Sequence, residues 1–150
     1  MPASEPTGLA RDALERVCSG SDPSAAVGVY SADFRDHVNA RDYTGHDGIR
    51  RSLGLYQLVF SDGDLRIRVE DQVTEGDRVA SRWVAEGHNR GRLIRIWGIV
   101  ISRIEDGEIV EDWAASDSLD VIRQLGPWRT LLLGIAARRS SRARAAAVDR

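Results

Sequence analysis

The chain contains no lysine, because all 21 of its basic residues are arginine. Schiff-base catalysis requires a lysine amine, so lysine-dependent aldolases and pyridoxal enzymes are excluded. Cys18 is the only cysteine. A single cysteine allows neither a disulfide within the chain nor a multi-cysteine zinc site.

Long apolar segments are also missing. The N-terminal stretch has no apolar region of the kind found in secretory signals. The longest apolar run, "TLLLGIAA" at residues 130–137, is far too short to span a bilayer. The net charge of -2 gives no basic excess for nucleic acid. We therefore expect a cytoplasmic protein whose partners include neither a membrane nor nucleic acid.

The composition and length indicate one globular domain. The chain has 150 residues, 42% of them hydrophobic and 29% charged, which is ordinary for a protein with a packed core. Apolar residues spaced three and four apart predict helices over about 8–17, 22–34 and 48–60. In the second of these, Asp22 and Pro23 suit an N-terminal cap and first turn, and Val27, Tyr30 and Phe34 form the apolar stripe.

After residue 64 the apolar period changes to two, which predicts about four antiparallel strands. Asp106-Gly107 is the strongest hairpin signal. A short helix follows over 118–125, before Gly126-Pro127. We expect a single domain over 1–128 and an Arg/Ala-rich tail over 129–150 that is partly disordered. Helices followed by a meander predict an α+β fold, in which helices close a curved sheet into a cone with a cavity.

Asp117 is the first candidate for chemistry. If the last strand continues through it, Asp117 shares a face with Trp113, Ala115 and Leu119. A carboxyl on such an apolar face would have a raised pKa, which suits proton transfer. The alternative is that Asp117 caps the helix that follows. The sequence leaves both interpretations open.

Cofactor sites are not indicated. His37, His46 and His88 lack the close spacing of a metal-binding motif, and no nucleotide-binding glycine motif occurs. Trp83, Trp97 and Trp113 fall on successive predicted strands. Such aromatic residues either fill a core or line a pocket for a flat polycyclic ligand.

Four stretches in this order and spacing resemble the SnoaL-like polyketide cyclase family of the nuclear transport factor 2-like (NTF2-like) superfamily. The resemblance covers about residues 10–126, and the stretches are "YSADFRDHVN", "GHDGIRRSL", "DLRIRVEDQVTEGDRVASRWVAEG" and "GIVISRIEDGEIVEDWAASDSLDVIRQLG". It implies an NTF2-like cone of helices on a curved antiparallel sheet. It also implies closure of a ring of an aromatic, anthracycline-type polyketide by intramolecular aldol condensation, without cofactor, metal or Schiff base.

The resemblance also implies site residues. Asp117 matches the family's acid/base aspartate, and His37 matches a family histidine. Asn89 stands where the family has a second histidine, with His88 one place earlier, and the family's "PPTG" loop is missing. The residues expected to bind substrate are Asn39, Trp83, His88, Asn89, Trp97 and Trp113.

Other functions of the same scaffold stay open. Relatives hydroxylate anthracycline rings with O2 and without metal or flavin, and the same aspartate could serve that step. A noncatalytic binding or dimerisation module is a further alternative, as is an isomerase, dehydratase or epoxide hydrolase. By family analogy we expect a homodimer formed through the outer face of the sheet.

Overall fold

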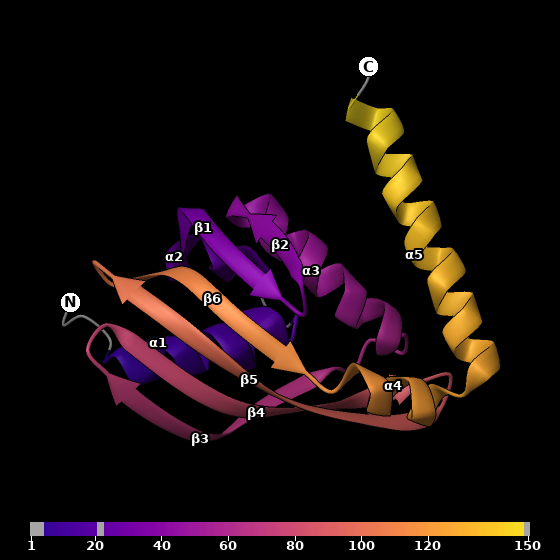
Figure 1. Ribbon diagram of the computed structural model, residues 1–150, viewed down its shortest axis with the longest axis horizontal. Helices are drawn as coiled ribbons and strands as arrows, with labels where there is room; N and C mark the ends of the chain where they lie inside the picture. Colours follow the sequence, from indigo (N-terminus) through magenta and orange to yellow (C-terminus); the bar gives the residue numbers. More distant parts are fainter. Residues whose placement is uncertain (1–4, 21–22, 149–150) are drawn as a thin grey trace.

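The computed structural model of the chain describes residues 5–20 and 23–148, which form a six-stranded sheet covered by helices on one side (Figure 1). The strands are β1 (Tyr30–Val38), β2 (Arg41–Thr44), β3 (Arg66–Glu75), β4 (Arg78–Asn89), β5 (Arg92–Glu105) and β6 (Glu108–Ser116). The helical segments are α1 (Pro6–Asp12), the π-helical η1 (Ala13–Cys18), the 3-10 turn η2 (Pro23–Ala25), α2 (Ala26–Val29), α3 (Gly45–Val59), α4 (Ser118–Leu125) and α5 (Pro127–Val148).

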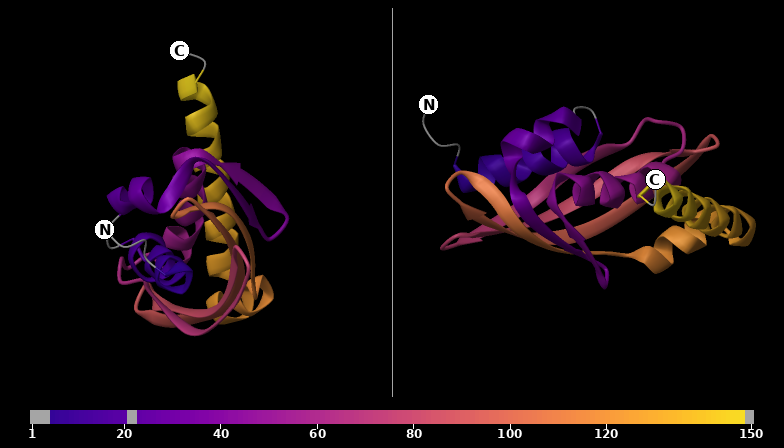
Figure 2. Two further views of the ribbon diagram at one scale, coloured as in Figure 1. Left: turned by 90° about the vertical axis from the view of Figure 1, so that its left-hand side faces the viewer. Right: turned by 90° about the horizontal axis from the view of Figure 1, so that it is seen from above.

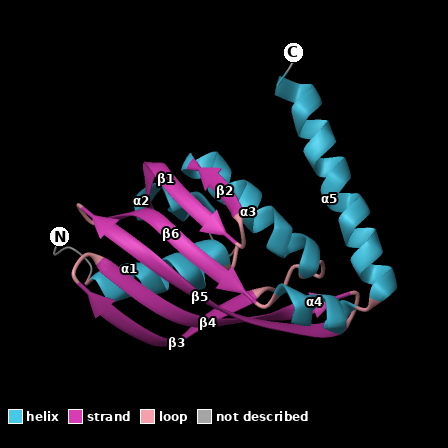
Figure 3. Ribbon diagram, viewed as in Figure 1, coloured by secondary structure: helices cyan, strands magenta, loops and turns pink. Residues whose placement is uncertain are grey.

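The strand order is β2-β1-β6-β5-β4-β3 (Figure 3). Strands β3 to β6 form the predicted antiparallel meander. The β5–β6 turn has Asp106 at φ 51° and Gly107 at φ 81°. Both residues are left-handed, as the type I′ hairpin predicted from Asp-Gly requires.

The predicted helix over 22–34 is wrong beyond residue 29, and its predicted cap, Asp22, lies outside the described residues. Tyr30 and Phe34 are buried, but they belong to β1. Residues four apart share a face in a strand as well as in a helix, so the spacing of Tyr30 and Phe34 fits both. Strand β1 pairs antiparallel with β2 and parallel with β6, which extends the sheet beyond the four predicted strands.

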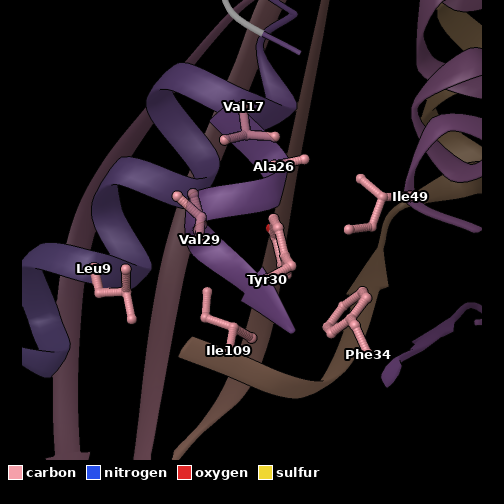
Figure 4. Close-up of a cluster of buried hydrophobic side chains, with 9 residues drawn as sticks. Leu9, Val17, Ala26, Val29, Tyr30, Phe34, Ile49 and Ile109 are labelled. Carbon is pink, nitrogen blue, oxygen red and sulfur yellow. The ribbon is translucent and has the colours of Figure 1, made fainter. Parts of the chain in front are cut away.

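The curved sheet wraps around the N-terminal helices (Figure 2). Segment η1 packs on β3, and α3 packs on β1 and β2. One core cluster lies between the first helices, β1 and α3, and includes Val17, Tyr30, Phe34 and Ile49 (Figure 4). A second cluster surrounds Trp83 on the inner face of the meander. Burial of these apolar side chains holds the helices inside the curve of the sheet.

The last helix lies in the segment for which partial disorder is expected, and that expectation stays a prediction. The structure describes α5 as helical from Pro127 to Val148, and it extends away from the sheet (Figure 1). Alanine, leucine and arginine have high helix propensity, so a helix can form here without the apolar period used in the prediction. The domain boundary at residue 128 stays a prediction. Within the described part of the chain, no helix combines the length and apolar character needed to cross a membrane.

Among the glycines, Gly98 leaves the least room for a side chain. Gly98 pairs with Trp83 across β4 and β5. A Cβ at this position would lie 2.3 Å from Cζ2 of Trp83 and 2.7 Å from the carbonyl oxygen of Ala115. The indole of Trp83 therefore occupies the space that a side chain at position 98 would need.

Gly98→Ala should lower the free energy of unfolding by roughly 1–3 kcal/mol, the usual cost of overpacking a core. Chemical denaturation of the variant measures this loss. The matched control is Gly54→Ala in α3, where the new Cβ meets nothing within 4 Å. Helix propensity should make that control neutral or slightly more stable. Equal stability of Gly98→Ala and the native chain would contradict the described packing.

Candidate active site

Two aspartates face each other on the inner surface of the sheet. Asp36 of β1 and Asp112 of β6 are direct register partners in the parallel pair. Side chains alternate between the two faces along a strand. Asp36 and Asp112 therefore point inward, and their neighbours His37, Glu111 and Trp113 point outward.

Both aspartates line a cavity enclosed by the sheet, η1 and α3. Its volume is about 60 Å³. The lining residues are mostly apolar or aromatic, namely Leu14, Cys18, Tyr30, Phe34, Asp36, Val38, Ile49, Ser52, Leu53, Tyr56, Ile67, Trp83, Val100, Asp112 and Ala114. No basic side chain is among these described lining residues, so nothing there neutralises the carboxyl groups.

Asp112 is the more deeply buried carboxyl, with 7% of its surface exposed. Burial and, to a smaller extent, the charge of Asp36 raise the pKa of Asp112 to about 8, against a hydrogen bond from Ser102 that favours the charged form. Desolvation dominates because a carboxylate loses its hydration in an apolar environment. At neutral pH Asp112 is therefore mainly a protonated acid.

Asp36 is also buried, but its pKa is raised less than that of Asp112. Burial raises the pKa of Asp36 to about 6, opposed by a hydrogen bond with Ser52 of α3 and by the nearby charge of His37. At neutral pH Asp36 is mainly a carboxylate. The cavity thus holds one proton acceptor and one proton donor, a division of roles that acid/base enzymes use.

Two further groups with protons lie in the cavity and stay neutral. The Sγ of Cys18 and the phenol oxygen of Tyr30 are 3.5 Å apart. Burial raises the pKa of Cys18 to about 12 and raises that of Tyr30 well above its ordinary value. The nucleophilic form of cysteine is the thiolate, so Cys18 is not an activated nucleophile here.

Asp117 lies outside this group. Its side chain accepts a hydrogen bond of 3.0 Å from the backbone N–H of Asp120 and caps α4. This confirms the capping interpretation. The expected orientation toward the cavity is wrong, because Asp117 is not among the described lining residues and β6 ends at Ser116. The acid/base role that the resemblance gave to Asp117 stays a prediction.

His37 and Trp113 lie on the outer face of the sheet. Their rings stack with centroids 5.8 Å apart, and the guanidinium of Arg78 lies 5.5 Å from the Trp113 ring centre. His37 Nδ1 is 2.7 Å from Oδ1 of Asp42, and Nε2 is 3.0 Å from Oε1 of Glu111. Hydrogen bonds to these two carboxylates raise the pKa of His37. The structure gives His37 ion-pair partners rather than access to the cavity.

The tryptophans of the meander are divided between the faces. Trp83 is 3% exposed and lines the cavity, whereas Trp97 is 53% exposed on the opposite face. The register explains this, because Trp97 pairs with Val84, one residue after Trp83. Only Trp83 of the three predicted tryptophans is placed to touch a ligand in the cavity.

The three remaining predicted binding residues hold the ends of elements together. The side-chain amide of Asn89 donates to the carbonyl oxygen of Val59 at 2.9 Å, at the end of α3. His88 Nδ1 is 2.6 Å from Oδ2 of Asp64. Asn39 follows β1, where its Nδ2 donates to Oγ of Ser116 at 3.0 Å and its Oδ1 accepts from the Ser116 N–H. None of the three is among the described cavity-lining residues.

The sequence contained a signal for the inward aspartates. Asp36 precedes His37 in "RDH" and Asp112 precedes Trp113 in "EDW", and both rings are predicted to face the cavity. Because a shift of one residue exchanges the faces of a strand, a prediction that turns the aromatic rings inward places Asp36 and Asp112 on the outer face. Within the described residues, no cluster of three or more His, Cys, Asp or Glu side chains is arranged to hold a metal ion.

Comparison with known proteins gives one family match. The sequence profile described as SnoaL-like polyketide cyclase matches residues 8–125. No curated protein is similar enough in sequence to match the chain.

Solved structures with the same fold are numerous. IdmH of Streptomyces antibioticus, a proposed polyketide cyclase, is 25% identical with a TM-score of 0.69, and the match covers 83% of this chain and 100% of IdmH. AclR of Streptomyces galilaeus, a proposed hydroxylase, is 19% identical with a TM-score of 0.67, covering 83% and 97%. A Catenulispora acidiphila protein with a ketosteroid isomerase-like fold is 18% identical with a TM-score of 0.65, covering 81% and 92%. The predicted NTF2-like α+β fold is thereby confirmed.

The buried carboxyls should make stability depend on pH. The pKa of Asp112 in the folded chain is about 8 and its ordinary value is 3.8. Between these values the folded state holds a proton that the unfolded state has released, so the free energy of unfolding decreases as pH rises, by up to about 1.4 kcal/mol per pH unit. The contribution is fully present below pH 3.8 and is lost as pH rises through about 8.

Asp112→Asn should flatten this decrease and raise the melting temperature at pH 7, because folding of the variant no longer requires a carboxyl that is ionised in the unfolded chain to take up a proton. Denaturant melts from pH 5 to 8 measure the slope, with the exposed Asp33→Asn as control. The same slope in Asp112→Asn and the native chain would show that Asp112 titrates normally.

Proposed function

The chain belongs to the SnoaL-like polyketide cyclase family, and we propose that it closes a ring of an aromatic, anthracycline-type polyketide by intramolecular aldol condensation. The observation that carries this proposal is the pair of inward aspartates, Asp36 and Asp112, in register within an otherwise apolar cavity. An aldol condensation needs a base at one carbon and an acid at one carbonyl oxygen. The pair supplies both without a cofactor.

The proposed reaction divides the work between the two carboxyls. Asp36, with a pKa of about 6, is the base that removes a proton from the carbon next to a carbonyl. The resulting enolate carbon forms a bond with a second carbonyl carbon. Asp112, with a pKa of about 8, donates its proton to the oxygen of that second carbonyl. Positioned proton transfer of this kind contributes roughly 10²–10⁴-fold to a rate.

The size of the cavity limits how a substrate enters. Its volume of about 60 Å³ is well below the roughly 300–1,000 Å³ of sites that enclose a drug-sized ligand. We propose that only the reacting end of the polyketide enters the space between Asp36, Asp112 and Trp83. The apolar walls exclude water there, which strengthens the electrostatic effect of each carboxyl.

The family resemblance gives a competing assignment, in which Asp117 alone moves the protons. Its position as the cap of α4 speaks for a structural role. Hydroxylation with O2 is a second candidate reaction, consistent with the fold shared with AclR. The two alternatives differ from the main proposal in the aspartate whose substitution lowers turnover or in the mass of the product.

Asp36→Asn and Asp112→Asn should each lower turnover of an anthracycline precursor by roughly 10²–10⁴-fold. Asp117→Asn is the matched control, because asparagine caps helices as well as aspartate does, and it should retain turnover within about threefold. Mass analysis identifies the product. An aldol cyclase gives an isomer of the substrate or that isomer less one water.

Two outcomes would overturn the assignment. Loss of turnover in Asp117→Asn alone would restore the single-aspartate mechanism. A product that contains one added oxygen, formed only when O2 is present, would replace the cyclase with a hydroxylase.

We also propose that the chain forms a homodimer through the outer face of the sheet. This follows the family analogy and is supported by exposed apolar residues in one line on β5, Trp97, Ile99 and Ile101. A single charge in the middle of this line should separate the protomers, because an unpaired buried charge is costly.

Light scattering should give the mass of a dimer for the native chain and of a monomer for Ile99→Arg. Val27→Arg is the control, since Val27 is also exposed but lies on α2 rather than on the outer face of the sheet. A monomeric native chain would contradict the proposed assembly.

A further inference from the structure

Two buried polar atoms have no hydrogen-bond partner within the described part of the chain, the indole Nε1 of Trp83 and Oδ1 of Asp112. Both residues line the cavity. Buried polar groups in proteins are almost always paired, and an unpaired one is costly. Because both residues line one cavity, a ligand that enters it is a candidate for both missing partners.

The indole of Trp83 is fixed in place. Gly98 leaves room for it on β5, and a Cβ there would come within 2.7 Å of Cε2, the carbon bonded to Nε1. Tyr56 meets the indole edge to face, with ring centres 6.2 Å apart. With 3% of the residue exposed, the N–H has little freedom to turn toward another acceptor.

Asp112 is held in a comparable way. The Ser102 hydroxyl forms a hydrogen bond with its carboxyl group, while Oδ1 has no partner. Ser102 is buried on β5, directly opposite Asp112 in the β5–β6 register. Oδ1 of this buried carboxyl therefore has a hydrogen-bonding capacity that no described residue uses.

We propose that the cavity recognises an enolisable ketone through two oxygen contacts, with Trp83 Nε1–H donating to one carbonyl oxygen and the carboxyl of Asp112 meeting a second. This rests on the proposed function and specifies its substrate class, a flat compound with two carbonyl groups close together. The new assignment is Trp83 as the donor that stabilises negative charge on oxygen.

The assignment completes the proton and electron balance of the aldol step. Asp36 takes the proton as the C–H bond breaks, and the electron pair moves onto the first carbonyl oxygen, which accepts from Trp83 Nε1–H. The enolate then forms the new C–C bond, and the proton of Asp112 moves to the second carbonyl oxygen. A preformed donor aimed at developing oxyanion charge is among the strongest sources of catalysis.

The test uses the 15N-labelled native chain and two small probes, cyclopentanone and cyclopentane, which differ in one oxygen. The four tryptophans give four indole N–H resonances. Trp97→Phe, Trp113→Phe and Trp128→Phe each remove one of them and leave that of Trp83 assigned by elimination. Cyclopentanone should move the Trp83 indole proton downfield, as a new hydrogen bond to a carbonyl does, and cyclopentane should not.

Affinity gives an independent readout. Trp83→Phe should weaken cyclopentanone binding roughly three- to tenfold, the usual effect of one hydrogen bond, and change cyclopentane binding less than twofold. An unmoved Trp83 resonance, an equal shift with both probes, or no cyclopentanone binding would each overturn the proposal. Because the resonance test uses the native chain, it does not depend on whether Trp83→Phe folds.

The two proposals can fail separately. Normal turnover in Asp36→Asn and Asp112→Asn would remove the proposed acid/base pair, whatever the indole resonance does. If cyclopentanone leaves the Trp83 resonance unmoved while both variants lose turnover as expected, only the role of Trp83 as oxyanion donor would be removed.

Discussion

The parallel pairing of β1 with β6 is the constraint on which the site depends. It sets Asp36 opposite Asp112 and turns both carboxyls toward an apolar cavity. Two carboxyls buried in an apolar cavity each favour the protonated form, and the second ionises less readily once the first is charged. A serine opposes the rise in pKa at each group, Ser52 at Asp36 and Ser102 at Asp112, and the pKa values are about 6 and about 8.

The same alternation of side chains gives the outer face a different chemistry. There His37 contacts Asp42 and Glu111, and Trp113 lies between His37 and Arg78. These groups keep their charges near solvent, where ion pairs contribute little to stability. The proposed proton transfer thus belongs to the inner face, and the outer face carries the ion pairs and the proposed contact surface.

The sequence predicted the meander because strict alternation and an Asp-Gly turn have few other interpretations. It missed β1 because Tyr30 and Phe34, four residues apart, fit a helix as well as a strand. The pairing of β1 with β6 joins segments more than seventy residues apart, which no local pattern reveals. Trp113 was assumed to be the inward residue because it is large and apolar, although its ring stacks between charged groups outside. A prediction with Trp113 pointing inward places Asp112 on the outer face, and so it does not identify Asp112 as a buried carboxyl.

The most direct test of the account is the titration of aspartate carboxyl carbons by 13C NMR, in the native chain and in Asp36→Asn. The account predicts that one carboxyl, identified as Asp112 by its loss in Asp112→Asn, titrates near pH 8. It also predicts that this midpoint falls when the charge of Asp36 is removed. Titration of Asp112 near its ordinary value of 3.8, unchanged in Asp36→Asn, would contradict the buried acid/base pair.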